Sequence, residues 1–247
     1  GLINNQLGIN GVCSCDLHIW KIFDDEPDYV NASRGYVYYV DPIMYRRALA
    51  DCVEDQVDVI NLSIGGPGAP DAQEKLLFSQ LLANGTIVCA AMGNERHYGS
   101  PTSYPAAIRG VIAVGATGLD DTVAGFSNRG NHIALCAPGQ AIWSTLPTYP
   151  GQSGFEAAVG PDGRPRQGKA KRRETNYDAW AGTSMATPHV AGAVALLLAN
   201  KGKMSQAAVR RTLMRSCDRV EGMGDEKFHP DYGAGRLNLH ALLEAEV

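Results

Sequence analysis

A serine stands near the start of a long apolar segment, where it can act as a nucleophile. The segment is GTSMATPHVAGAVALLLAN, residues 182–200, and Gly182 allows a tight entry into it. The pattern predicts a helix that is apolar on nearly every side and therefore buried, with Ser184 in its first turn. The unpaired N–H groups and positive dipole end of such a helix favour negative charge beside the hydroxyl, as attack on a carbonyl requires. Taken alone, the pattern also fits Ser184 as an N-cap residue, which is the commoner role.

An amide and a glycine-rich turn follow two other predicted strands. Asn94 ends the sequence AAMGN, so its side-chain N–H and the backbone N–H of Ser184 can form a two-donor oxyanion hole. The sequence NLSIGGPG (61–68) has glycines that leave backbone free to pair with an extended peptide. Separately, Asn94 fits a turn residue and the glycines fit a strand exit. Together with the serine helix, they predict a site for nucleophilic attack on a carbonyl.

Strand-like and helix-like segments alternate along the chain and must position these groups. Short β-branched segments predict strands at residues 17–23, 57–64, 86–91, 110–116 and 132–137. Helical patterns lie at residues 42–56 and 70–85, and Ser205 is placed to cap a later helix. This alternation predicts an α/β fold of three layers with a mainly parallel central sheet. Ligands of such folds bind beyond the carboxyl ends of the strands.

Composition limits the class of protein. A chain of 247 residues with 45% apolar residues predicts one domain spanning residues 1–247. No stretch approaches the roughly 18 consecutive apolar residues of a membrane span. The net charge of −4 is too small to indicate a nucleic-acid or membrane partner. None of the six cysteines forms a C-x-x-C pair, so we expect free thiols, a weak pointer to a reducing compartment.

Six basic residues gather between positions 164 and 173. They lie in a stretch at about 148–178 that is rich in Gly, Pro, Gln and Arg, and we expect an exposed insertion loop there. The sequence G-x-x-x-x-G-K at 163–169 mimics a phosphate-binding loop, but Ala170 replaces the required Ser or Thr. The loop either selects substrates, is cut during maturation, or is a solvated basic surface.

In these motifs the chain resembles the subtilisin-like serine proteases, or subtilases, from about residue 4 onward. GTSMATPHVAG is similar to the family's nucleophile motif almost letter for letter, and VDVINLSIGG, AAMGN, FSNRG and YGAGRLNLHALL follow in the family's order. The resemblance implies a subtilisin-like fold with Ser184 as nucleophile and Asn94 as oxyanion donor. It also implies a pocket for the residue before the scissile bond, lined by Ser63, Ile64 and Gly65, by Ala91, Met92 and Gly93, and by Ser103 near its base. The Tyr104–Pro105 peptide matches a cis position.

The family's aspartate motif D-T/S-G and histidine motif H-G-T-H are both missing from this sequence. NNQLGINGV (4–12) resembles the stretch after the histidine helix, so we expect both residues upstream and an N-terminally truncated domain. His189 cannot substitute, because five residues at about 100° each place it roughly 140° around the helix from Ser184. We therefore expect a serine endopeptidase that forms an acyl-enzyme on Ser184, with this fragment alone inactive. The alternatives are a peptide-binding pseudoprotease and a two-chain enzyme whose other fragment carries the missing pair.

The opening residues resemble the family's loop around a tightly held Ca²⁺. By that resemblance Asn5 contributes its side-chain oxygen, while Ile3, Leu7 and Ile9 contribute backbone carbonyls. One carboxylate ligand would come from upstream, so we expect an incomplete structural site.

Partners, compartment and substrate preference follow less directly from the sequence. The expected partners are a peptide or protein substrate and an upstream fragment or prodomain of the same protein. The family is often secreted, against the cysteine pattern, so the compartment stays open. Substrate preference is also open: Glu95, beside the pocket, could favour Lys or Arg before the cut, or point to solvent.

Overall fold

The structure is a computed structural model that describes residues 6–30 and 35–246. Its centre is a four-stranded parallel sheet in the order β3 (Val59–Leu62), β4 (Ile87–Ala91), β5 (Ile112–Thr117) and β6 (Ile133–Pro138). Every residue of β4 and β5 is buried, as expected for parallel strands covered on both faces. Four of the five predicted strands are therefore confirmed.

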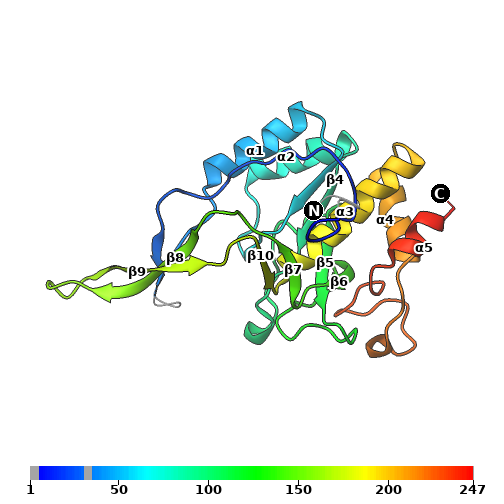
Figure 1. Cartoon of the computed structure of the whole chain (residues 1–247). Helices are drawn as coiled ribbons and strands as arrows, with labels where there is room; N and C mark the ends of the chain where they lie inside the picture. Colours follow the sequence, from blue (N-terminus) through cyan, green and yellow to red (C-terminus); the bar gives the residue numbers. More distant parts are fainter. Residues whose placement is uncertain (1–5, 31–34, 247) are drawn as a thin grey trace.

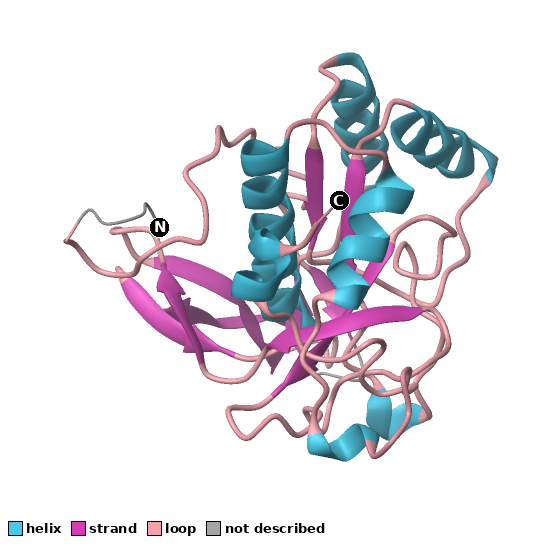
Figure 2. Cartoon of the chain, turned by 90° about the vertical axis from the view of Figure 1, so that its right-hand side faces the viewer, coloured by secondary structure: helices cyan, strands magenta, loops and turns pink. Residues whose placement is uncertain are grey.

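Helices cover the sheet on both faces, which confirms the α/β layering (Figures 1 and 2). The helices α1 (Pro42–Glu54) and α2 (Ala72–Ala83) pack on one side, and their N-caps Asp41 and Asp71 accept hydrogen bonds from the first-turn N–H groups. The other side carries α3 (Thr183–Lys201), α4 (Gln206–Arg215) and α5 (Leu239–Glu244). Ser205 caps α4 as predicted, because its side chain accepts from the Ala208 N–H.

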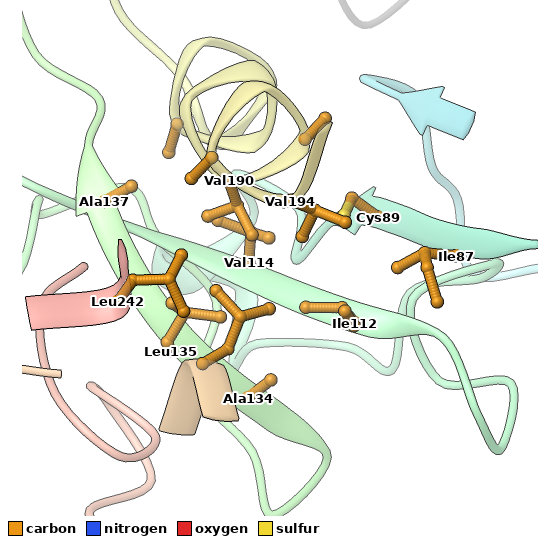
Figure 3. Close-up of a cluster of buried hydrophobic side chains, with 14 of the residues drawn as sticks. Ile87, Cys89, Ile112, Val114, Ala134, Leu135, Ala137, Val190, Val194 and Leu242 are labelled. Carbon is orange, nitrogen blue, oxygen red and sulfur yellow. The ribbon is translucent and has the colours of Figure 1, made fainter. Parts of the chain in front are cut away.

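The helix α3 lies against all four parallel strands. Its side chains Val190 and Val194 pack among Cys89 of β4, Val114 of β5 and other fully buried residues (Figure 3). Side chains of α4 and α5 join the same buried cluster, so an apolar residue fits at most positions of α3, while Pro188 is exposed. The predicted buried helix is confirmed.

The predicted strand at 17–23 does not form. This segment makes one isolated bridge, between Phe23 and Val40, and Leu17 and Ile19 are 77% and 87% exposed. A strand needs a hydrogen-bonded partner, and within the described residues this segment pairs with no strand of the parallel sheet. Residues with high strand propensity do not form a strand without a neighbouring strand to pair with, so this segment stays an extended apolar stretch.

The expected basic loop is instead a β-hairpin. Its strands are β8 (Gly151–Val159) and β9 (Pro165–Arg173), joined by a turn in which Gly163 has a φ of 75°. The hairpin extends a small sheet through β2 (Gly35–Val37) and β1 (Asp28–Val30), and it projects from the body as an arm (Figure 1). The prediction of a loop was wrong because both faces of the arm meet solvent, so the strands carry no apolar alternation.

Short elements complete the chain. The strands β7 (Ile142–Thr145) and β10 (Tyr177–Trp180) pair at the base of the arm, and the two short 3₁₀ helices are η1 (Arg96–Tyr98) and η2 (Glu221–Met223). All six cysteines are free, as expected, and burial raises the pKa of Cys89 to about 12. Of the helices in the described residues, none has the length and apolar character to cross a bilayer.

Truncation of one core side chain tests the packing of α3. Leu197→Ala should lower the free energy of unfolding by about 2–5 kcal/mol, because it empties a fully buried position. Urea unfolding followed by circular dichroism measures the change. The same truncation at Leu119, which is 93% exposed, should change stability by less than about 0.5 kcal/mol. Equal effects at both positions would contradict the packing described.

Candidate active site

The helix α3 begins at a cleft and places Ser184 in its first turn. Gly182 is the N-cap, with a φ of 155° and a ψ of 158°, a conformation open essentially to glycine. Ser184 is the second helical residue, is half-buried and lines the cleft. The N-cap interpretation of Ser184 is therefore wrong, and its hydroxyl does not serve as the cap of this helix.

Asn94 is held by the first residue of α3 in an orientation that its hydrogen bonds define. The Thr183 backbone N–H donates to Asn94 Oδ1 over 2.9 Å, and Thr183 Oγ1 donates to the same oxygen over 3.0 Å. A backbone N–H can only donate, so the atom of Asn94 that faces it must be the carbonyl oxygen. The amide nitrogen Nδ2 consequently points away from Thr183.

Two N–H donors come together beside Gly182. Asn94 Nδ2 and the backbone nitrogen of Ser184 each lie 3.6 Å from the point that a Cβ on Gly182 would occupy. Met185 Sδ lies 3.5 Å from the same point, and any side chain at position 182 would stand close to all three atoms. Two donors near one point at a helix N-terminus form an arrangement that can stabilise a developing oxyanion.

A cavity of about 830 Å³ includes Ser184 and Asn94 in its lining. The loop after β3 supplies Ser63, Ile64 and Gly65, and the end of β4 with its loop supplies Ala91 and Gly93. These residues lie where the sequence analysis expected pocket walls, at the carboxyl ends of neighbouring strands. The volume is in the range of sites that enclose a small ligand or a few residues of a peptide.

Two expected pocket residues do not line the cavity. Met92 is fully buried and packs in the core on the α1–α2 side of the sheet. Side chains alternate along extended backbone, so Met92 turns away while its neighbours Ala91 and Gly93 face the cleft. Ser103 lies behind the wall: a Cβ on Gly65 would be 2.5 Å from its Oγ, so this hydroxyl backs the glycine and is not an open pocket base.

The loop after β3 is tied to both α3 and the segment around Tyr104. The Ser63 hydroxyl donates to the carbonyl oxygen of Ser184 over 2.7 Å, which fixes this wall to the first turn of α3. Gly66 exchanges both backbone hydrogen bonds with Tyr104, and the Tyr104–Pro105 peptide is cis, as the resemblance implied. Successive residues of an extended segment direct their N–H and C=O groups to opposite edges. The N–H and C=O of Gly65 therefore face away from Tyr104, where another extended segment can pair with them.

The Glu95 carboxylate accepts hydrogen bonds from the loop that carries Asn94, so it does not point only to solvent. Its Oε2 accepts from the Asn94 backbone N–H over 2.9 Å and from Asn128 Nδ2 over 3.0 Å. Asn128 Oδ1 in turn accepts from the Glu95 N–H over 2.8 Å. Sequence reasoning gave no role to Thr183 or Asn128, although both lie inside quoted motifs, because a motif does not reveal which side chains hold the others.

Neither component of a His–Asp pair lies among the described residues of the cleft. Its lining contains no His and no Asp within residues 6–30 and 35–246. His189 Nδ1 lies 2.9 Å from the Met185 carbonyl on its own helix, and His97 is an exposed residue of η1. Neither histidine is part of the cavity lining.

The expected Ca²⁺ loop lies only partly within the structure. Ile3 and Asn5 fall outside the described residues, while Leu7 and Ile9 lie on a tightly curled segment in which Gln6 and Gly8 have φ values of 56° and 64°. Such curling turns backbone carbonyls inward, as a hard cation requires. Where the structure describes the chain, it groups no three His, Cys, Asp or Glu residues suited to a metal.

Known proteins share both the sequence pattern and the fold. Subtilisin E of Bacillus subtilis (strain 168) is 32% identical over 249 residues, covering 98% of this chain, and subtilisin of Bacillus pumilus is 33% identical over 248 residues. The chain spans about half the length of subtilisin E (53%) and 73% of the Bacillus pumilus protein. Fervidolysin from Fervidobacterium pennivorans, a keratinolytic enzyme related to subtilisin, superposes with a TM-score of 0.67 at 29% identity, covering 84% of this chain and 30% of its own.

The family model agrees with these relatives. The model described as the subtilase family matches residues 1–235, which includes every residue discussed for the cleft. The matched residues include the four strands of the parallel sheet and the helix α3. The chain belongs to the subtilase family of serine proteases.

Proposed function

We propose that this chain is the nucleophile-bearing part of a serine endopeptidase. The observation that carries the proposal is the meeting of Asn94 Nδ2 and the Ser184 N–H beside Gly182, in the lining of a cavity that also contains Ser184. A serine at a helix N-terminus with two N–H donors near one point suits nucleophilic attack on a carbonyl carbon, where an oxyanion develops.

In the proposed mechanism Ser184 Oγ attacks the carbonyl carbon of the scissile peptide. A histidine oriented by an aspartate, both supplied from outside these residues, accepts the serine proton and returns it to the leaving amine. The N–H groups of Ser184 and Asn94 hold the oxyanion of the tetrahedral intermediate. Water then releases the acyl group from Ser184.

The free edge of β3 is a suitable place for the missing pair to approach. Within the described residues β3 pairs with β4 alone. A parallel strand added to that edge would end beside Ser63, which lines the cleft and bonds to α3. The proposal therefore assigns the base and its orienting carboxylate to a segment that completes the sheet.

The substrate is proposed to be an extended peptide or protein segment. Gly65 lines the cleft, while its neighbour Gly66 is already paired with Tyr104. The N–H and C=O of Gly65 therefore suit a bound strand on the opposite edge, the usual way in which a sheet edge takes a peptide. An upstream fragment or prodomain of the same protein is a second proposed partner.

A structural Ca²⁺ at the curled N-terminal loop is also proposed. The described part of this loop, residues 6–12, contains no carboxylate, so the donors it offers are neutral oxygens such as the carbonyls of Leu7 and Ile9. Neutral oxygen ligands suit Ca²⁺ but bind it weakly without a charged ligand. The ion would order the loop, and no catalytic step depends on it.

The second candidate is a pseudoprotease that binds peptides without cutting them. It is favoured by one observation, the lack of His and Asp in the described lining of the cleft. The two candidates differ in the complete protein, where only an enzyme presents a histidine to Ser184. A two-chain enzyme gives the same chemistry with the base on a separate fragment.

Reactivity of Ser184 separates these candidates. The isolated 247-residue chain should show no turnover that depends on Ser184, because the base is absent. In the complete protein a fluorophosphonate should label Ser184 and block peptide hydrolysis, and Ser184→Ala should abolish both. Mass spectrometry of the native protein identifies a second fragment. Rapid cleavage by the isolated chain, lost on Ser184→Ala, would refute the missing-base part of the proposal, and an unlabelled Ser184 in the complete protein would refute catalysis.

The oxyanion arrangement can be tested through Thr183, a buried residue that holds Asn94 by two hydrogen bonds. Thr183→Val removes the hydroxyl bond to Asn94 Oδ1 and should lower kcat of the complete protein by about tenfold while KM changes little. Thr183→Ser keeps the hydroxyl and should stay near the wild-type rate. Asn94→Ala should cost about 10²–10³ in kcat, the loss known for the corresponding substitution in subtilisin, itself a member of this family. Equal losses for the Val and Ser variants would show that Thr183 acts through packing alone.

A further inference from the structure

Neither carboxylate in the described lining of the cleft forms an ion pair, and one of them, Glu74, has few hydrogen-bond partners. Glu74 and Glu95 are the charged residues of the lining, and the described part of that lining has no Lys, Arg or His. Glu95 is committed to Asn94 and Asn128, as described above. Glu74, in the first turn of α2, accepts a hydrogen bond from a neutral donor, the Tyr45 hydroxyl, over 3.3 Å. Glu74 therefore forms no direct ion pair with a described Lys, Arg or His residue.

The nearest cation is engaged elsewhere. Arg46 Nη1 lies 3.0 Å from Asp71 Oδ2 and 3.4 Å from Gln73 Oε1, and its Nε donates to the Pro42 carbonyl. Burial raises the pKa of the Glu74 carboxyl and the charge of Asp71 adds to the rise, while the hydrogen bond from Tyr45 and the more distant charge of Arg46 oppose it. A half-buried carboxylate without a counter-ion is destabilising, and a cation delivered by a bound molecule would relieve this.

The same cavity has an aromatic surface that suits the stem of a basic side chain. Tyr39 and Phe23 line it and are 50% and 42% exposed, and Tyr38 and Tyr45 line it as well. The methylene groups of Lys and Arg pack on such rings, and their charged ends are attracted to the ring faces. A carboxylate among tyrosines thus matches a guanidinium or ammonium group better than an apolar or acidic one.

We propose that the cleft selects peptides with an arginine or lysine side chain, whose charge pairs with Glu74 while the aromatic residues cover its stem. This inference rests on the proposed function, because Ser184 lines the same cavity. It assigns specificity to Glu74 and leaves Glu95 the separate task of holding Asn94. Substitution of Glu74 should therefore change the peptide preference, whereas substitution of Glu95 should disturb the position of Asn94.

A peptide-binding scan tests this selection without any bond being cut. The protein is the Ser184→Ala form of the 247-residue chain, and the probes are fluorescein-labelled alanine hexapeptides with one Arg, Gln or Glu at each position in turn. At one position Arg should bind about tenfold more tightly than Gln, the size of a charge-assisted hydrogen bond at a half-buried site, and Glu should bind less tightly than Gln. Fluorescence anisotropy gives the Kd values. The preference should shrink when salt rises from about 0.05 to about 0.5 M, because ions screen exposed charge pairs.

Three variants assign the preference to one side chain. Glu74→Gln should abolish the preference for Arg, and Glu74→Lys should reverse it in favour of Glu. Glu54→Gln makes the same charge change on α1 outside the cavity lining and should leave the preference intact. Circular dichroism and thermal unfolding confirm that each variant is folded.

The outcomes separate this inference from the proposed function. Equal binding of Arg and Gln peptides at every position, a preference that survives Glu74→Gln, or no binding by any peptide overturns the inference. Failure of the proposed function shows instead as an unlabelled Ser184 in the complete protein, with the Arg preference still present in the binding scan.

Discussion

The burial of α3 is the constraint on which the rest of the site depends. This helix contacts all four parallel strands and α5, and its side chains from Ala186 to Leu197 are largely excluded from solvent. Most of this helix is covered, although Pro188 is exposed on one side, and its first turn opens at the cleft. Its N-terminal N–H groups therefore emerge at the carboxyl ends of the strands, where loops from β3 and β4 also end. The site follows from this layering of the fold.

A small set of hydrogen bonds fixes the loops to that helix end. Thr183 bonds to Asn94 through its backbone and its hydroxyl, and its hydroxyl also accepts the Gly93 N–H over 3.2 Å. Ser63 bonds to the Ser184 carbonyl from the other side. These bonds fix the orientation of the Asn94 amide and the position of the first turn of α3, which is the kind of preorganisation that the proposed mechanism needs. Glu95 and Asn128 supply the outer support of the same loop.

Much of the fold and the central pair of site residues could be predicted from the sequence. The buried strands β4, β5 and β6 and the helix α3 are dense in apolar residues, so their period and length identify them. The arm could not be predicted, because strands wetted on both faces lose the alternation that marks a strand. The apolar segment 17–23 failed for the opposite reason, since propensity cannot supply a partner. Met92 was misplaced because a motif gives neighbouring residues one role, whereas extended backbone sends alternate side chains to opposite sides.

The supporting residues could not be predicted from the sequence, for a different reason. Thr183, Asn128 and Glu74 act through contacts between segments far apart in the chain, and no local pattern records them. Their roles depend on which atom faces which partner, as with the orientation of the Asn94 amide. These contacts can be identified only in the folded structure, where the distant segments lie side by side.

The projecting arm has a mechanical consequence. Strand β8 pairs with β2, and Gln152 on β8 donates to the hydroxyl of Tyr38, which follows β2 and lines the cavity. The arm and the tyrosine wall are therefore parts of one hydrogen-bonded ribbon. The basic residues of the arm lie along β9 and the turn before it, so a protein that binds them would apply force to the same ribbon that carries Tyr38 of the cleft wall.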